Sequence, residues 1–195
     1  DKLLIDFEPV EQNFTGTFSS IEKVIGGFSD DTISGTNSND NLSGGDGGDE
    51  LFGRDGNDQL YGDAGSDLLN GGNGKDRMTG GSGADRLRGG KGADHFGLNS
   101  AGDGIDRILD FNRRQGDKVT LRGRDFRGLS KGRVSANQFV ANANGKAEDR
   151  QDRLVFNTRT RALFYDPDGN GSAKAVKLAV LNKGVTLRNT DFLIT

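Results

Sequence analysis

The sequence predicts an all-β protein whose central part is a parallel β-roll, a solenoid in which short strands stack into two sheets. The main observation is a nine-residue repeat that runs from Gly26 to Gly97 in eight copies, without insertion or deletion. Composition is the second observation, because glycine makes up 32 of 195 residues and hydrophobic residues only 31%. An ordinary globular core is hard to build from such a chain, so a periodic fold would need bound ligands for stability.

Three positions define the register of the repeat. Glycine occupies the first position of every copy, aspartate the sixth and a large apolar residue the eighth, and the fourth position is glycine in six copies. The aspartates are Asp31, Asp40, Asp49, Asp58, Asp67, Asp76, Asp85 and Asp94. The apolar residues are Ile33, Leu42, Leu51, Leu60, Leu69, Met78, Leu87 and Phe96.

Each position has a physical reason. Six residues would form a turn, where glycine accepts backbone angles that other residues avoid, and three would form a short strand. Because side chains alternate along a strand, position eight would point inward and positions seven and nine outward. Two copies make one coil of strand, turn, strand and turn, and successive coils would lie about 4.8 Å apart. Four turns would then stack on each side of the roll.

The stacked turns would present carbonyl and carboxylate oxygens to the gaps between them. These are the ligands that calcium prefers. Three gaps on each side indicate roughly six full calcium sites, with partial sites at the ends. Without calcium, the aspartates would repel one another and the chain would tend to be disordered. Besides the eight aspartates, the predicted ligands are Gly44, Gly47, Gly53, Gly56, Gly62, Gly65, Gly71, Gly74, Gly80, Gly83, Gly89 and Gly92.

This pattern resembles the RTX family of hemolysin-type calcium-binding repeats, whose consensus is G-G-x-G-x-D-x-U-x. The resemblance implies a calcium-bound β-roll in the C-terminal region of a protein exported by type I secretion. Relatives often continue with a D-x-I-x-D-F stretch, which Asp106, Ile108, Asp110 and Phe111 match apart from one extra residue, Leu109. By that resemblance, Asp106 or Asp110 would complete the last calcium site. The alternative is a plain capping strand with surface carboxylates.

The first two copies depart most from the consensus. Thr36 replaces the second glycine of its copy, and Ser29 and Ser38 replace the fourth. We expect the calcium sites near Gly26 to be looser or half-empty. Arg54 and Asp63 also replace second-position glycines, where the side chain matters less if the ligand is the backbone.

The segments outside the repeat are expected to close the ends of the solenoid, because an open end exposes apolar side chains and unpaired backbone. Residues 1–25 are predicted as an N-terminal capping segment, with strands at 3–7 and 21–25 joined by a polar loop. Residues 26–97 form the roll, and residues 98–195 a β-rich C-terminal cap. In that cap we expect strands at 104–111, 116–121 and 175–181, and a hairpin of 154–157 with 162–165.

Two motifs in the C-terminal part have alternative interpretations. Asp166, Asp168 and Asn170 have the spacing of the start of an EF-hand loop, but Lys177 stands where that loop needs a glutamate. A hairpin turn and a separate calcium loop therefore both remain open. Residues 190–195 place an aspartate before a short apolar run, which resembles the uncleaved signal of type I secreted proteins. The alternative is a last strand within the cap.

Charge divides the chain into two halves. Residues 1–97 hold 8 Lys and Arg against 18 Asp and Glu, whereas residues 98–195 hold 18 against 11. A basic stretch in the second half could contact an acidic polysaccharide or a cell surface. The acidic roll beside it argues against nucleic acid. No stretch is apolar enough for a transmembrane segment. The basic stretch consists of Arg122, Arg124, Arg127, Lys131 and Arg133.

Nothing in the sequence indicates catalysis. Cysteine is absent, which excludes thiolate chemistry, and the single histidine, His95, takes an outward repeat position. The chain begins at Asp1 without a visible signal peptide, which indicates a fragment or processed product of a larger protein. Any catalytic domain of that parent protein would lie outside this chain.

The predicted function is therefore a calcium-ion binding module, secreted and extracellular. It would fold on extracellular calcium and support the secretion and stability of a larger protein exported by the type I apparatus. The alternative is a calcium-rigidified module that binds polysaccharide or a cell surface, as in an adhesin or an epimerase-like repeat module.

Overall fold

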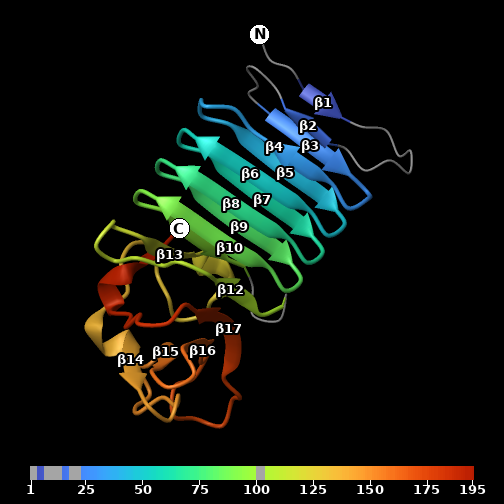
Figure 1. The fold of residues 1–195 in the computed structure, drawn as a ribbon. Coiled ribbons are helices and arrows are strands. Elements are labelled where there is room, and N and C mark those ends of the chain that lie inside the picture. Colours follow the sequence, from blue (N-terminus) through green and yellow to red (C-terminus); the bar gives the residue numbers. More distant parts are fainter. Residues whose placement is uncertain (1–3, 7–14, 18–22, 100–103) are drawn as a thin grey trace.

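The computed structural model describes residues 4–6, 15–17, 23–99 and 104–195, and within these ranges two sheets contain all the named strands (Figure 1). The eight-stranded sheet has the order β1 (Leu4–Asp6), β3 (Lys23–Gly27), β5 (Asn41–Asp46), β7 (Gln59–Ala64), β9 (Arg77–Ser82), β11 (His95–Leu98), β13 (Lys118–Leu121) and β18 (Phe192–Ile194). The ten-stranded sheet has the order β14 (Phe139–Asn142), β15 (Leu154–Asn157), β16 (Ala162–Tyr165), β17 (Val176–Leu181), β12 (Asp106–Ile108), β10 (Arg86–Lys91), β8 (Leu68–Asn73), β6 (Glu50–Asp55), β4 (Thr32–Ser34) and β2 (Thr15–Thr17).

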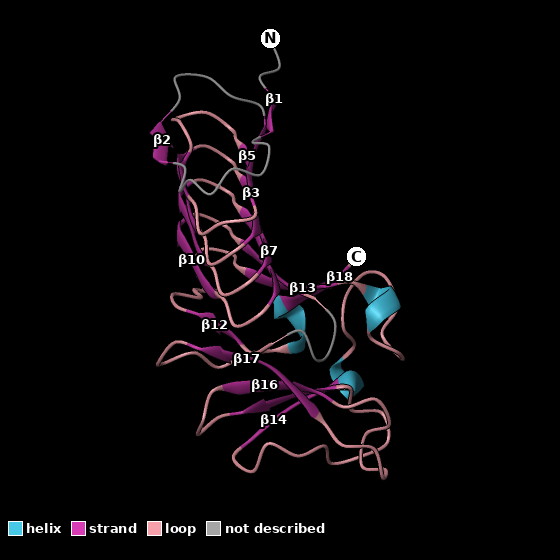
Figure 2. Ribbon diagram, turned by 90° about the vertical axis from the view of Figure 1, so that its right-hand side faces the viewer, coloured by secondary structure: helices cyan, strands magenta, loops and turns pink. Residues whose placement is uncertain are grey.

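The repeat region is a parallel β-roll, which confirms the predicted fold class. Successive copies alternate between the two sheets, and each strand pairs in parallel with the strand two copies later, for example Leu51 with Leu69 and Leu60 with Met78. Figure 2 shows the stacked turns from the side. The position-eight side chains form a continuous apolar row between the sheets, and each is at most 1% exposed. This row is the core of the roll, because side chains at positions seven and nine face outward.

The strands of the roll are longer than the sequence predicts. Strands β5 to β10 have six residues each and extend from position seven of one copy to position three of the next. The prediction of three-residue strands was wrong, because the glycine-rich positions keep their ladder hydrogen bonds with the coils above and below. Pairing of Gly72 with both Arg54 and Gly90 illustrates this. Only positions four to six remain as the turn.

The N-terminal part differs from its prediction in one place. Strand β1 falls within the predicted strand at 3–7, and β3 overlaps the predicted strand at 21–25, although part of each lies outside the described residues. Strand β2, however, lies in the stretch expected to be a polar loop. It pairs in parallel with β4, with Thr15 opposite Thr32. The loop interpretation was wrong because neighbouring coils can hold a polar segment as a strand through backbone pairing alone.

In the C-terminal part, both sheets of the roll continue. Strand β12 pairs in parallel with β17, and β13 with β18. The predicted hairpin is confirmed, since β15 and β16 are antiparallel around the turn at 158–161, and β17 confirms the strand expected at 175–181. The strands expected at 104–111 and 116–121 are present but shorter, as β12 and β13. The division into three domains stays a prediction, and the sheets run across its boundaries.

Apolar side chains also connect the roll to the C-terminal part. Phe96, the last residue of the position-eight row, packs against Phe111 with ring centroids 6.1 Å apart. Beyond it, Phe126 meets Tyr165 edge to face at 5.1 Å. The core therefore extends from the roll into the C-terminal part. Three short 3-10 helices, η1 (Gly123–Asp125), η2 (Ala136–Gln138) and η3 (Asn189–Asp191), lie in the loops of this part. Among the described residues, no helix has the length and apolar character to cross a bilayer.

Arg54 offers a test of the backbone geometry of the roll. It adopts a φ of 77° at a position where the next two strands of the sheet have glycine: Gly72, with a φ of 108°, and Gly90, with a φ of 93°. A non-glycine residue in this region costs about 1–2 kcal/mol, and glycine gives back about 0.4–1 kcal/mol through unfolded-chain entropy. We expect Arg54→Gly to raise the free energy of unfolding by about 0.5–1 kcal/mol, measured by urea unfolding at saturating calcium. Arg88→Gly is the control, because Arg88 does not have a positive φ, and it should lower the free energy of unfolding. A lower free energy of unfolding in both variants would contradict the argument.

Candidate calcium sites

The repeat aspartates form two ladders, one along each side of the roll. The backbone N–H of each aspartate donates to Oδ1 of the aspartate one coil further on. Asp49 N–H, for example, donates to Asp67 Oδ1 at 2.8 Å, and Asp58 N–H to Asp76 Oδ1 at 2.9 Å. The carboxylates are therefore held in fixed positions by the turns themselves. One ladder contains Asp31, Asp49, Asp67, Asp85 and Asp106, and the other contains Asp40, Asp58, Asp76, Asp94 and Asp117.

The second carboxylate oxygen is left without a protein partner in six of these residues. In each case Oδ2 is buried and accepts no hydrogen bond, although a buried carboxylate oxygen normally has one. The six residues are at most 1% exposed, so bulk solvent does not reach these oxygens. Six buried, negatively charged oxygens thus face the interior of the turns without a partner. They belong to Asp49, Asp58, Asp67, Asp76, Asp85 and Asp94.

Each of these oxygens lies against a first-position glycine. A Cβ built on Gly62 would collide with Asp67 Oδ2 and with the carbonyl oxygen of Gly80, one coil further on. At Gly53 the same collision involves Asp58 Oδ2 and the carbonyl oxygen of Gly71. Carboxylate and carbonyl oxygens therefore converge on the space that a side chain would fill. This space is available only because the residue there is glycine.

The fourth-position glycines have a different role in the stack. Their N–H groups donate to backbone carbonyls of the next coil, as from Gly65 to Ser82 at 2.8 Å. Their Cα atoms lie close to the carbonyl oxygen of the fourth-position glycine one coil earlier, for example Gly83 against Gly65. These contacts set the spacing of the turns. The predicted fourth-position ligands thus lie in the turns that hold the aspartates, whereas the first-position glycines lie in the adjoining strands. The individual roles of both sets as ligands stay a prediction.

Burial of the carboxylates raises their pKa. It reaches about 7 for Asp58 and Asp67 and about 6 for Asp49 and Asp94. Desolvation is the largest cause, and the charges of neighbouring ladder aspartates raise the pKa further. A positive ion in the turns would reverse both effects. Without such an ion, the folded protein is therefore destabilised at neutral pH.

The donor set fits calcium. Hard, charged carboxylate oxygens and backbone carbonyls are calcium ligands, and the calcium ion accepts many oxygens in flexible geometry. Among the described residues, no three Asp, Glu, His or Cys side chains gather in a conventional metal cluster. Each turn instead contributes one aspartate, and backbone oxygens would supply the rest. The aspartate ladders would hold the ion, and the ion would supply the charge that the buried carboxylates lack.

Each ladder ends on an aspartate outside the repeat: Asp106, which the sequence predicted, and Asp117, which it did not. Asp106 accepts the N–H of Asp85 at 3.2 Å and thus continues its ladder. Asp117 does the same for Asp94 at 3.1 Å, and burial raises its pKa to about 6. No sequence signal pointed to Asp117, because it follows Asp94 by 23 residues instead of 18. Asp110 differs, since its two oxygens accept the N–H groups of Gly89 and Gly90, both at 2.9 Å.

At the N-terminal end, Thr36 changes the site of its copy. Its N–H donates to Asp40 Oδ2 at 2.6 Å, and its hydroxyl lies 3.1 Å from the same oxygen. The carboxylate oxygen that is free in later copies is therefore occupied by the protein. This geometry supports the expectation of a half-empty site in the second copy. It also explains why Asp40, unlike Asp58 in the same ladder, has no unpartnered Oδ2.

The remaining candidate residues lie outside the roll. Residues 166–175 connect the antiparallel strands β16 and β17, so the hairpin interpretation of Asp166 and Asp168 agrees with the structure, although the connection is not a tight turn. Metal binding by Asp166, Asp168 and Asn170 stays a hypothesis. In the basic stretch, Arg122 and Arg124 both lie beside Asp125, with N to O distances of 3.7 and 3.8 Å. This stretch is therefore partly neutralised.

Fold and site together define a calcium-binding parallel β-roll. The family model of RTX calcium-binding nonapeptide repeats, which describes four copies, matches residues 25–60, 43–78 and 61–96. Residues 25–96 therefore match the model of RTX calcium-binding nonapeptide repeats, in the stretch where the sequence pattern predicted them.

Two further comparisons complete the picture. The solution structure of the AlgE6R3 subunit from the Azotobacter vinelandii mannuronan C5-epimerase is similar, with 25% identity and a TM-score of 0.32. The match covers 86% of this chain and 80% of that one. A comparison with curated proteins gives no match.

The raised pKa values predict opposite pH dependences with and without calcium. Between pH 3.8 and about 7, the calcium-free folded chain binds more protons than the unfolded chain at Asp58 and Asp67. Its free energy of unfolding should therefore fall as pH rises through this window. The calcium-bound protein should instead gain stability, because the ion needs ionised carboxylates. In calcium-free buffer, the β signal in far-UV circular dichroism should be larger at pH 4.5 than at pH 7.5, whereas in millimolar calcium, urea unfolding should give the higher free energy at pH 7.5. The same sign in both buffers would contradict it.

Proposed function

We propose that this chain is a non-catalytic module that folds when it binds about six calcium ions outside the cell. The single observation that supports this number is the set of six buried Oδ2 atoms without partners. Burying six unpaired carboxylates at neutral pH is too costly for a roll whose apolar core is one row of side chains. Calcium binding would therefore be coupled to folding.

Such a module would support the secretion and stability of a larger exported protein through the type I apparatus. Extracellular calcium modules bind with dissociation constants of about 10⁻⁴–10⁻³ M, so the chain would stay unfolded at cytosolic calcium and fold after export. The candidate secretion signal at the C-terminus is compatible with this order. In the folded protein, Phe192 and Ile194 are buried in β18, so the signal would be accessible only before folding.

Far-UV circular dichroism during a calcium titration tests the proposal. We expect a disordered spectrum in chelator that turns into a β spectrum at sub-millimolar to millimolar calcium. Magnesium is the control, because it demands a stricter octahedral geometry and gives up its water less readily. A β spectrum that persists in chelator would overturn calcium-driven folding.

A second candidate function is binding to an acidic polysaccharide or a cell surface. The observation that favours it is a set of cations on the outer faces of the sheets. Arg86 lies directly beside Arg107 in one sheet. In the other sheet, Arg77 and Lys118 flank His95, whose pKa is lowered by burial and by these two cations. Like charges in adjacent strands are destabilising, so an anionic partner would compensate for their cost. Binding of acidic oligosaccharides by the calcium-loaded protein tests this function.

A further inference from the structure

A polar groove lies in the C-terminal part of the chain, away from the roll. Its volume is about 340 Å³, large enough for a sugar residue. One wall comes from η2 and the residue before it, and the other from the segment that precedes β15. The lining residues are Ser135, Asn137, Gln138, Arg150, Gln151 and Arg153.

Hydrogen bonds within the groove hold its amide side chains in place. The Ser135 hydroxyl lies 2.5 Å from Asn137 Oδ1 and 2.8 Å from Gln138 Oε1. Asn137 Nδ2 donates to Gln151 Oε1 at 2.7 Å, which joins the two walls. Gln138 Nε2 donates to the Gly128 carbonyl at 2.8 Å. These bonds engage the oxygens of all three amides and one N–H group each of Asn137 and Gln138, and the Gln151 amide keeps its N–H groups for a ligand.

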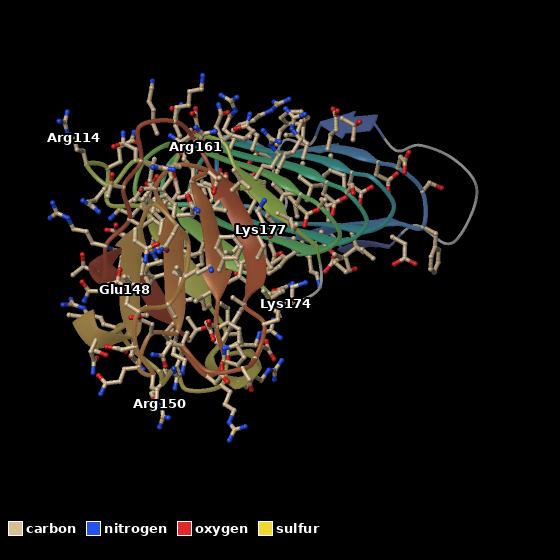
Figure 3. The ribbon with its side chains drawn as sticks, turned by 90° about the horizontal axis from the view of Figure 1, so that it is seen from below. Arg114, Glu148, Arg150, Arg161, Lys174 and Lys177 are labelled. Carbon is tan, nitrogen blue, oxygen red and sulfur yellow. The ribbon has the colours of Figure 1, made fainter. Side chains whose placement is uncertain are left out.

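Two arginines of the groove lack a negative partner. Arg153 Nη1 donates to the carbonyl oxygens of Arg150 and Asp152, and its Nε is buried without any hydrogen-bond partner. Figure 3 shows Arg150 pointing outward at the edge of the C-terminal part, away from Lys174 and Lys177. Neither arginine forms an ion pair within the described part of the chain. The groove therefore combines fixed polar side chains with two arginines that form no ion pair among the described residues, beside the carboxylates of Asp149 and Asp152.

We propose that this groove binds the carboxylate or sulfate group of an acidic polysaccharide. Arginine recognises such planar or tetrahedral anions through paired N–H donors, and the neighbouring Gln151 amide can donate to an adjacent sugar hydroxyl. The assignment rests on the second function proposed above and localises it. It does not depend on calcium-driven folding.

Isothermal titration calorimetry with three probes tests the groove, at saturating calcium and about 100 mM salt. The probes are a tetragalacturonate for carboxylates, a heparin tetrasaccharide for sulfates and neutral maltotetraose. Arg150→Gln is the main variant, because the Arg150 side chain makes no bond that the fold needs. Arg159→Gln is the matched control, since Arg159 is an exposed arginine of the β15–β16 turn outside the groove. Circular dichroism establishes that each variant is folded.

We expect an acidic probe to bind the wild type and maltotetraose not to bind. Arg150→Gln should weaken that binding about tenfold, the effect of one lost charge-assisted hydrogen bond, and Arg159→Gln less than about twofold. Equal weakening by both variants would overturn the groove and leave diffuse binding by the basic half. No binding of either acidic probe by the folded wild type would overturn the groove together with the second function. Comparison of the two acidic probes identifies the preferred anion.

Discussion

Asp67→Asn is expected to destabilise the calcium-bound protein and to stabilise the calcium-free one at neutral pH. Asparagine keeps the oxygen that accepts the Asp49 N–H, so the ladder hydrogen bond survives. It replaces the unpartnered Oδ2 by a neutral amide, which is a poor calcium ligand. In the calcium-free protein, the same change removes a buried charge whose pKa burial has raised to about 7. The two states should therefore respond with opposite signs.

In the presence of calcium, Asp67→Asn should lower the free energy of unfolding by the contribution of about one calcium site. At calcium concentrations ten to a hundred times the dissociation constant, that is about 1.5–2.7 kcal/mol. Urea unfolding at saturating calcium measures the loss, and a larger β signal of the variant in calcium-free buffer, by far-UV circular dichroism, measures the gain. The calcium midpoint of the circular dichroism titration should move to higher concentration. Asp46→Asn is the control, because Asp46 is an exposed carboxylate at position three of its copy. If Asp67→Asn destabilised both states equally, its role would be structural and not that of a calcium ligand.

Arg113→Gln should release the last strand of the eight-stranded sheet. Asp191 is 1% exposed, and the Arg113 guanidinium donates to both of its oxygens at 2.6–3.0 Å. The same guanidinium donates to the Thr186 carbonyl at 2.7 Å. Removing the arginine leaves a buried carboxylate without its counterion directly before β18. Breaking such a pair costs about 3–5 kcal/mol when both partners are buried, and we expect about 2–4 kcal/mol because Arg113 is partly exposed.

Thermal unfolding at saturating calcium measures this loss, and limited proteolysis should show earlier cleavage near residues 186–195. Arg114→Gln is the matched control, since Arg114 is exposed and its side chain has no ion pair among the described residues. If both variants unfolded at the same temperature as the wild type, the Arg113 and Asp191 pair would not hold β18. If both were destabilised equally, net charge and not the pair would be the cause.

The sequence predicted the roll and the stacking of its aspartates because these depend on a strict local period. Each copy repeats the same short strand and turn, so the position of Asp58 or Leu60 in its own copy already defines whether it faces the turn interior or the core. The inward row of apolar residues and the aspartate ladders can be predicted from the pattern of a single nine-residue copy. Thr36 was also identified as a weak point for the same reason, because it breaks the pattern within one copy.

Apart from the strand length in the roll, the missed features depend on pairing between segments whose separation is not a multiple of the period. Asp117 joins the ladder after 23 residues, and β18 pairs with β13 across about 70 residues of chain. The strand at 15–17 depends on β4 as a partner, because its own residues carry no strand pattern. The groove likewise requires η2 and residues 150–153 to meet, which no local pattern indicates.

The amino-acid sequence by itself therefore determined the class of fold, the direction of each repeat side chain and the kind of ion that the turns can hold. These features follow from alternation along a strand and from the tolerance of glycine, which are properties of a few adjacent residues. Only the tertiary structure decided which carboxylate oxygens remain without a partner, where the ladders end and how the last strand is held. Those features depend on the stacking of coils, which brings together backbone groups that the sequence separates.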